Sequence, residues 1–97
     1  MRYEIVLAPE AVEALRRLRA QERTAVTNAM ETHLRNQPGT TSRSRIKRLR
    51  GLSRPQYRLR VGEVRVFYDI SGSVVEVLAI VSKTEVDEWL AQFGSPQ

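Results

Sequence analysis

The sequence contains no cysteine and a single histidine, His33. The lack of cysteine excludes disulfides, thiolate metal sites and dithiol redox chemistry, and it is compatible with a reducing compartment. One histidine cannot form a His-based metal cluster, so we expect no metal and no other cofactor. It also disfavours a Ser/His/Asp arrangement, and we expect His33 to be a surface or capping residue.

Long hydrophobic runs are also missing. The longest purely aliphatic run, residues 77–81, is far shorter than a membrane span. Glu4, Pro9 and Glu10 interrupt the N-terminal segment in which a signal peptide would need its apolar stretch. With 97 residues, the chain is long enough for one modest hydrophobic core. We therefore expect a single soluble domain over residues 1–97, located in the cytoplasm and without membrane contact.

Positive charge is present, but in one part of the chain. Residues 43–65 hold nine of the sixteen lysines and arginines and one acid, Glu63, which gives a formal charge of +8, whereas the remainder carries −3. Fourteen of the sixteen basic residues are arginine, which binds phosphate groups bidentately and stacks on bases. This pattern indicates a polyanionic partner, most often nucleic acid. A solvated basic surface or an acidic protein partner would explain the same charge.

Hydrophobic spacing predicts a short strand at residues 3–7 and then two helices, the first beginning at Pro9 and the second at about Glu22. Two helices so close together predict an antiparallel helical hairpin. Residues 40–45 are polar, and we expect a mobile loop there. A third helix is predicted near the C-terminus by an apolar stripe of Val86, Trp89, Leu90 and Phe93.

Two strand-like segments, residues 57–61 and 64–70, are separated only by Gly62-Glu63, which suits a two-residue hairpin turn. This turn fixes the register and pairs Arg60 with Arg65. One face of the hairpin is then apolar, and the other carries Arg58, Arg60, Arg65 and Phe67. A like-charge cross-strand pair is unfavourable unless an anion lies between its members, so we expect a binding or catalytic face. Residues 74–81 are apolar on both faces and predict a central strand.

These segments carry a family resemblance. The stretches LAPEAVEALRRL, KRLRGL, YRLRVGEVRVFYDI and EVLAIVSK resemble the RelE/ParE superfamily of bacterial type II toxins, specifically its RelE-like members, from Tyr3 to about Phe93. The most specific signal is G-x-x-R-V-x-Y, which begins at Gly62. The resemblance implies an α+β fold in which an N-terminal strand and a helical hairpin pack on a twisted antiparallel sheet of about four strands, with a C-terminal helix.

The resemblance also implies a function. RelE-like toxins enter the ribosomal A site and cut mRNA without a metal, by attack of a ribose 2′-hydroxyl on the adjacent phosphate. The implied catalytic residues are Arg58, Arg60 and Arg65, with Lys83 near the position at which the family has an arginine. We expect RNA contacts from Lys47, Arg48, Arg50 and Phe67. The implied partners are a cognate antitoxin, in a toxin–antitoxin hetero-oligomer, and the ribosome with its mRNA.

The match lacks a general base. A C-terminal tyrosine that serves some members has no counterpart here, because the region offers Trp89 and Leu90, and arginine stays protonated. Glu85 or Glu88 could fill the role, although acids at a helix N-terminus are usually structural. Two alternatives therefore stay open: a ParE-like inhibitor of DNA gyrase, and a non-catalytic RNA-binding or protein-binding relative.

Overall fold

The computed structural model describes residues 2–96, which form two sheets, three α-helices and one 3₁₀ turn. The larger sheet contains β1 (Glu4–Leu7), β2 (Ile46–Arg48), β4 (Tyr57–Val61), β5 (Val64–Ser71) and β6 (Val74–Ser82). The smaller sheet contains β3 (Leu52–Arg54) and β7 (Ser95–Pro96). The helices are α1 (Pro9–Arg17), α2 (Ala20–Leu34) and α3 (Val86–Phe93), which follows the 3₁₀ turn η1 (Lys83–Glu85). None of these helices is long and apolar enough to cross a membrane.

The larger sheet has the strand order β1-β6-β5-β4-β2. Strand β1 pairs with β6 in parallel, and the other neighbours pair antiparallel. The α+β fold with its N-terminal strand, helical hairpin and C-terminal helix is confirmed, but the sheet is mixed and has a fifth strand, β2, at its edge. Strands β2, β3 and β7 are two or three residues long, too short for an alternating pattern to predict.

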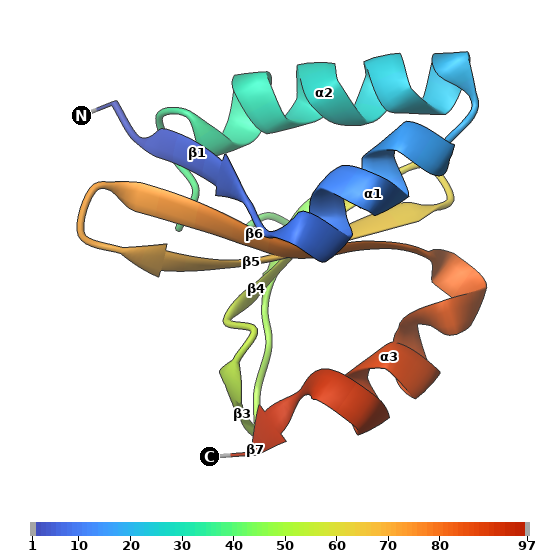
Figure 1. Cartoon of the computed structure of the whole chain (residues 1–97). Coiled ribbons are helices and arrows are strands. Elements are labelled where there is room, and N and C mark those ends of the chain that lie inside the picture. The colour runs from blue at the N-terminus through green and yellow to red at the C-terminus, as the bar shows by residue number, and fades with distance from the viewer. Residues whose placement is uncertain (1, 97) are drawn as a thin grey trace.

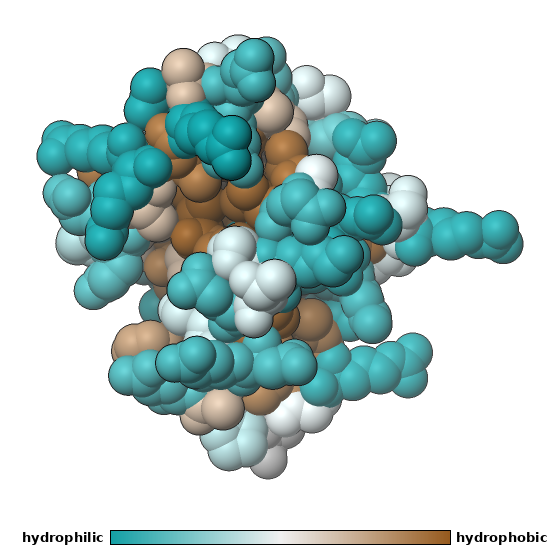
Figure 2. Space-filling model, turned by 90° about the vertical axis from the view of Figure 1, so that its right-hand side faces the viewer, coloured by the Kyte–Doolittle hydropathy of each residue, from teal (hydrophilic) through white to brown (hydrophobic). Residues whose placement is uncertain are grey.

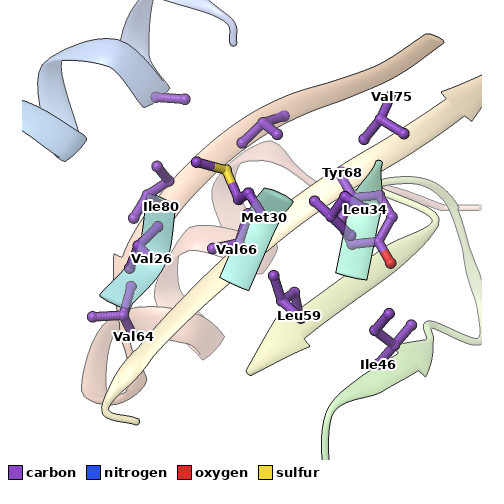
Figure 3. Close-up of a cluster of buried hydrophobic side chains, with 12 residues drawn as sticks. Val26, Met30, Leu34, Ile46, Leu59, Val64, Val66, Tyr68, Val75 and Ile80 are labelled. Atoms are coloured by element: carbon purple, nitrogen blue, oxygen red, sulfur yellow. The ribbon is translucent and has the colours of Figure 1, made fainter. Parts of the chain in front are cut away.

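Helices α1 and α2 cover one face of the sheet (Figure 1). Pro9 occupies the first turn of α1, as predicted, and α2 begins at Ala20, two residues before the predicted start. Val26, Met30 and Leu34 recur every fourth residue on α2 and are buried against the sheet (Figure 3). Their sheet partners are the fully or almost fully buried side chains Leu59, Val64, Val66, Tyr68, Val75, Val77 and Ile80.

The opposite face of the sheet is covered only in part, by α3 (Figure 1). No residue of α3 is fully buried. Its main contact is Trp89, whose ring stacks on Phe67 of β5 with centroids 5.0 Å apart and planes 6° apart. Beyond α3, the chain ends in β7, which pairs with β3. The C-terminal segment therefore crosses this face and is attached at both ends.

The β4–β5 hairpin has the predicted register, including the pair of Arg60 with Arg65. Gly62 adopts φ 58°, a left-handed conformation that glycine reaches without strain. The φ of Glu63 is not positive, as expected for the predicted turn. The apolar face of the hairpin points into the core, where the Tyr68 hydroxyl donates a 2.6 Å hydrogen bond to the Pro38 carbonyl oxygen. The arginine face is thereby directed away from α1 and α2.

Candidate nucleic-acid interface

Cations from three adjacent strands meet on the face of the sheet opposite α2. Arg58 and Arg60 lie on β4, Arg65 lies across from Arg60 on β5, and Lys47 lies across from Arg58 on the edge strand β2. Because directly paired residues share a face, the strand pairing places all four on one side. We call Lys47, Arg58, Arg60 and Arg65 the cationic cluster. Three of its four members are the predicted catalytic arginines.

Arg58 occupies the middle of this cluster. Its side chain is half-buried, and its Nε is buried without a hydrogen-bond partner among residues 2–96. The pKa of Arg58 is lowered, first by burial and then by the positive charges of Arg65 and Arg60. A buried donor without an acceptor is costly, since desolvation is not compensated. An anion on this face would supply the opposite charge.

Arg65 is only 8% exposed. One of its terminal nitrogens, Nη1, donates to the carbonyl oxygens of Gly62 at 2.7 Å and Val64 at 3.1 Å. The guanidinium therefore holds the hairpin turn as well as contributing charge. For Nη2, no hydrogen bond is formed among residues 2–96.

Lys83 begins η1 beside the tip of the same hairpin. Its backbone nitrogen donates to the Glu63 carbonyl oxygen at 2.7 Å, and its Nζ lies 3.9 Å from the Glu63 carboxylate. Both side chains are more than half exposed, so this ion pair is weak. Lys83 is placed near the turn that Arg65 stabilises, and its ammonium is available to a ligand.

The remaining predicted RNA contacts are spread over the surface. Arg48 lies at the edge of the sheet, with its guanidinium 5.0 Å from the centre of the Tyr57 ring. Arg50 is exposed in the bend after β2. Phe67 is different: it is fully buried under Trp89. The expected RNA contact of Phe67 would need a free ring face, and α3 already occupies the face that Trp89 covers.

Among the residues that the structure describes, 2–96, no general base lies in an evident position beside the cationic cluster. His33 on α2 accepts a hydrogen bond from Arg45 at 2.9 Å. Glu85 accepts one from the Ser82 hydroxyl at 2.8 Å, and Glu88 is exposed on α3. Within residues 2–96, no group of three or more acidic or histidine side chains is arranged to hold a metal ion. The cluster is thus suited to binding phosphate and stabilising negative charge.

The surface also contains apolar hollows. One of about 440 Å³ lies between α1, β6 and α3 and is lined by Ala14, Ala79, Trp89 and Phe93 among others. Another, of about 370 Å³, lies between the end of α1 and the hairpin; it includes Leu18 and Val64 but is also lined by charged residues, among them Glu22, Glu63 and Glu85. On this side of the molecule, Figure 2 shows apolar surface rimmed by hydrophilic side chains. Apolar hollows beside charged rims are typical of protein-binding surfaces.

A protein-family model matches most of the chain. The family described as "ParE toxin of type II toxin-antitoxin system, parDE" matches residues 5–86. The chain therefore belongs to this family and, with it, to the RelE/ParE superfamily that the sequence resembles. It is a toxin of a type II toxin–antitoxin system. No curated protein matches the chain significantly.

Solved structures share the fold. The RelB–RelE antitoxin–toxin complex of Methanococcus jannaschii contains a chain that is 18% identical, with a TM-score of 0.68 over 87% of this chain and 96% of that chain. The RelBE2 complex of Mycobacterium tuberculosis gives 22% identity and a TM-score of 0.68 over 84% and 99%. The YoeB dimer of Staphylococcus aureus contains a chain that is 16% identical, with a TM-score of 0.61 over 81% of this chain and 94% of that chain. At these identities the similarity establishes the fold alone.

Proposed function

We propose that this toxin is a ribosome-dependent mRNA endonuclease that inhibits translation in the cytoplasm. The observation that supports the proposal most is the cationic cluster, at whose centre Arg58 has a buried Nε without an acceptor. A phosphate bound beside Arg58 would offset the repulsion between Arg58, Arg60 and Arg65, which water cannot do.

The proposed reaction is an internal transfer. The ribose 2′-oxygen attacks the adjacent phosphorus and loses its proton to a base, the bond to the 5′-oxygen breaks, and that oxygen takes up a proton. The products are a 2′,3′-cyclic phosphate and a 5′-hydroxyl end. Negative charge grows on the phosphate oxygens in the transition state, where Arg58, Arg60, Arg65 and Lys83 would stabilise it.

The ribosome has two roles in this proposal. It presents the mRNA strand in a fixed geometry, and it supplies the base that the toxin lacks or positions Glu85 or Glu88 for that role. Arginine cannot accept the proton, because it stays charged throughout the physiological pH range. We therefore expect free RNA to be cleaved far more slowly than ribosome-bound mRNA.

A cognate antitoxin would bind and inhibit this toxin in a hetero-oligomer. Two of the structural neighbours described above are toxins in complex with their antitoxins. We propose that an acidic segment of the antitoxin covers the cationic cluster while apolar side chains enter the adjacent hollows. Charge complementarity would make the association rate fall with increasing salt.

Inhibition of DNA gyrase is the second candidate, because the matching family is named after ParE toxins. A non-catalytic binding protein is the third, since the general base is unassigned. One pair of assays separates these candidates: mRNA cleavage in a purified translation system, and supercoiling by purified gyrase. The proposal expects cleavage without inhibition of gyrase; gyrase inhibition without cleavage supports the second candidate, and neither effect supports the third.

A further inference from the structure

A further cationic hollow lies at the edge of the sheet, between α2, the segment before β2 and the end of β4. Its volume is about 450 Å³, and it is lined by Ala29, Ser44, Arg45, Arg60, Val61 and Gly62. We call it the edge hollow. Two guanidinium-bearing residues and one hydroxyl-bearing residue line it, and no carboxylate does. Among residues 2–96, neither Arg45 nor Arg60 forms an ion pair. The edge hollow therefore has the chemistry of an anion site.

Arg45 is held in place at three points. Its backbone nitrogen donates to the Ser42 hydroxyl at 3.0 Å, and its carbonyl oxygen accepts from the Arg60 nitrogen at 2.8 Å. Its Nη1 donates to Nε2 of His33 at 2.9 Å. A long exposed arginine normally loses substantial rotamer entropy when it binds a ligand. Here part of that ordering is already present in the free protein, since His33 restrains the guanidinium.

The position of the edge hollow favours a nucleic-acid strand. Arg60 lies two residues after Arg58 on β4, which corresponds to about 6.7 Å along a strand. Neighbouring phosphates of an extended single strand have a similar separation. A strand with one phosphate at Arg58 therefore places the next phosphate near Arg60, which lines the edge hollow together with Arg45. This step depends on the proposed function, in which Arg58 binds a phosphate of RNA.

We propose that the edge hollow is a second phosphate subsite, in which Arg45 and Arg60 bind the phosphate adjacent to the one at Arg58 and His33 positions Arg45. The ligand is thus single-stranded RNA contacted at two successive phosphates. His33 is a positioning residue in this arrangement and takes no part in proton transfer.

Binding of a non-cleavable strand tests the proposal. Fluorescence anisotropy would follow a labelled 2′-O-methyl octaribonucleotide and the full chain over a range of salt concentrations. Arg45→Ala should weaken binding about tenfold at low salt and lower the slope of log Kd against log salt by about 0.7, the value for one phosphate of a single strand. Arg43→Ala is the matched control, since Arg43 is an exposed arginine outside the hollow whose loss removes the same charge.

Coupling between residues tests the shared subsite. In the Arg45→Ala/Arg60→Ala double variant, the loss should be smaller than the product of the single losses, because both side chains bind one phosphate. His33→Ala should reproduce part of the Arg45→Ala effect and have no effect in the Arg45→Ala background. His33→Gln, which keeps an acceptor, should bind close to the wild type. Unchanged melting temperatures would show that these variants fold.

Several results would overturn the inference. Equal effects of Arg45→Ala and Arg43→Ala, or independent effects of Arg45 and Arg60, would mean that the hollow binds no shared phosphate. A larger effect of Arg45→Ala on an acidic peptide of equal charge than on the oligonucleotide would assign the hollow to a protein partner. Ribosome-dependent cleavage combined with any of these results would leave the proposed function standing without the second subsite. Coupled effects on oligonucleotide binding without ribosome-dependent cleavage would support the second subsite and contradict the proposed endonuclease function.

Discussion

Trp89 of α3 lies flat against Phe67 of β5, with ring centroids 5.0 Å apart. Phe67 pairs with Arg58 on one side and with Ala79 on the other. On this face of the sheet, the stack therefore lies between a cationic part, on β2, β4 and the start of β5, and an apolar part, on β6. The first part fits a phosphate chain, and the second fits apolar side chains of a protein partner.

Trp89→Ala should detach α3 from the sheet. We expect the free energy of unfolding to fall by about 2–3 kcal/mol, because a partly buried stacked indole is removed. Phe93→Ala is the control: this ring is 56% exposed, and its loss should cost less than about 1 kcal/mol. Urea denaturation followed by circular dichroism would measure both. Equal stabilities would contradict the view that the stack holds α3.

Arg65→Ala should lower stability by about 1–2 kcal/mol, because two hydrogen bonds to the hairpin carbonyls are lost, although repulsion with Arg60 and Arg58 is relieved. Arg60→Ala removes the same like-charge pair without losing a side-chain hydrogen bond, and its melting temperature should stay constant or rise. Thermal melts of the two variants would compare these effects. A stable Arg65→Ala protein would contradict the structural role given to this guanidinium.

Arg58→Met should stabilise the fold while removing phosphate binding. Methionine keeps an unbranched apolar stem, and the substitution removes a buried unsatisfied Nε and its repulsion with Arg60 and Arg65. We expect a gain of about 1 kcal/mol in the free energy of unfolding. Calorimetry at low and high salt would detect it. A clear loss of stability would mean that Arg58 is needed for folding and is not an unpaired ligand-binding group.

Stability should fall below pH 6.5 because of His33. Burial and then the charge of Arg45 lower the pKa of His33 from its ordinary 6.5, and Arg45 donates to it. The folded state thus favours neutral His33, and the unfolded chain takes up the proton more readily. His33 and Arg45 also line a hollow distinct from the edge hollow. Its other residues are Thr32, Gln37, Thr40, Ser42 and Ile46, and none of them is acidic.

Melting temperatures between about pH 7.5 and 5.5 would measure the stabilisation that neutral His33 contributes. This stabilisation should be fully present above the pKa of His33 in the unfolded chain, and it should be lost as the pH falls through the lower pKa of His33 in the folded protein. His33→Gln should flatten the profile in this range. Glu31 also has a lowered pKa, through its hydrogen bond from Arg35, but its ordinary value of 4.5 places its effect at more acidic pH. A His33→Gln profile identical to that of the wild type would contradict the assignment.

Local signals predicted the hairpin well. Gly62-Glu63 determines the turn. A two-residue turn then determines every cross-strand pair of the hairpin, from Tyr57–Tyr68 to Val61–Val64. The same alternation places Phe67 on the arginine face, but it does not show what covers that face. Trp89, which covers it, is 22 residues away in sequence.

Other features depend on long-range packing. The parallel pairing of β1 with β6 joins segments about 70 residues apart, and periodicity carries no information about it. The hydrogen bond between His33 and Arg45 crosses from α2 to the chain just before β2. His33 was expected to be a surface or capping residue, and no local pattern indicates that it holds an arginine beside Arg60.

Mapping mRNA ends by primer extension in a purified translation system tests the central claim most directly. The wild-type toxin and the Arg43→Ala control should cut ribosome-bound mRNA, Arg58→Met should reduce the rate about a hundredfold or more, and RNA without ribosomes should stay largely intact. Intact mRNA with the wild-type toxin, or cleavage that persists in Arg58→Met at the wild-type rate, would contradict the proposal that the cationic cluster is the active site of an mRNA endonuclease.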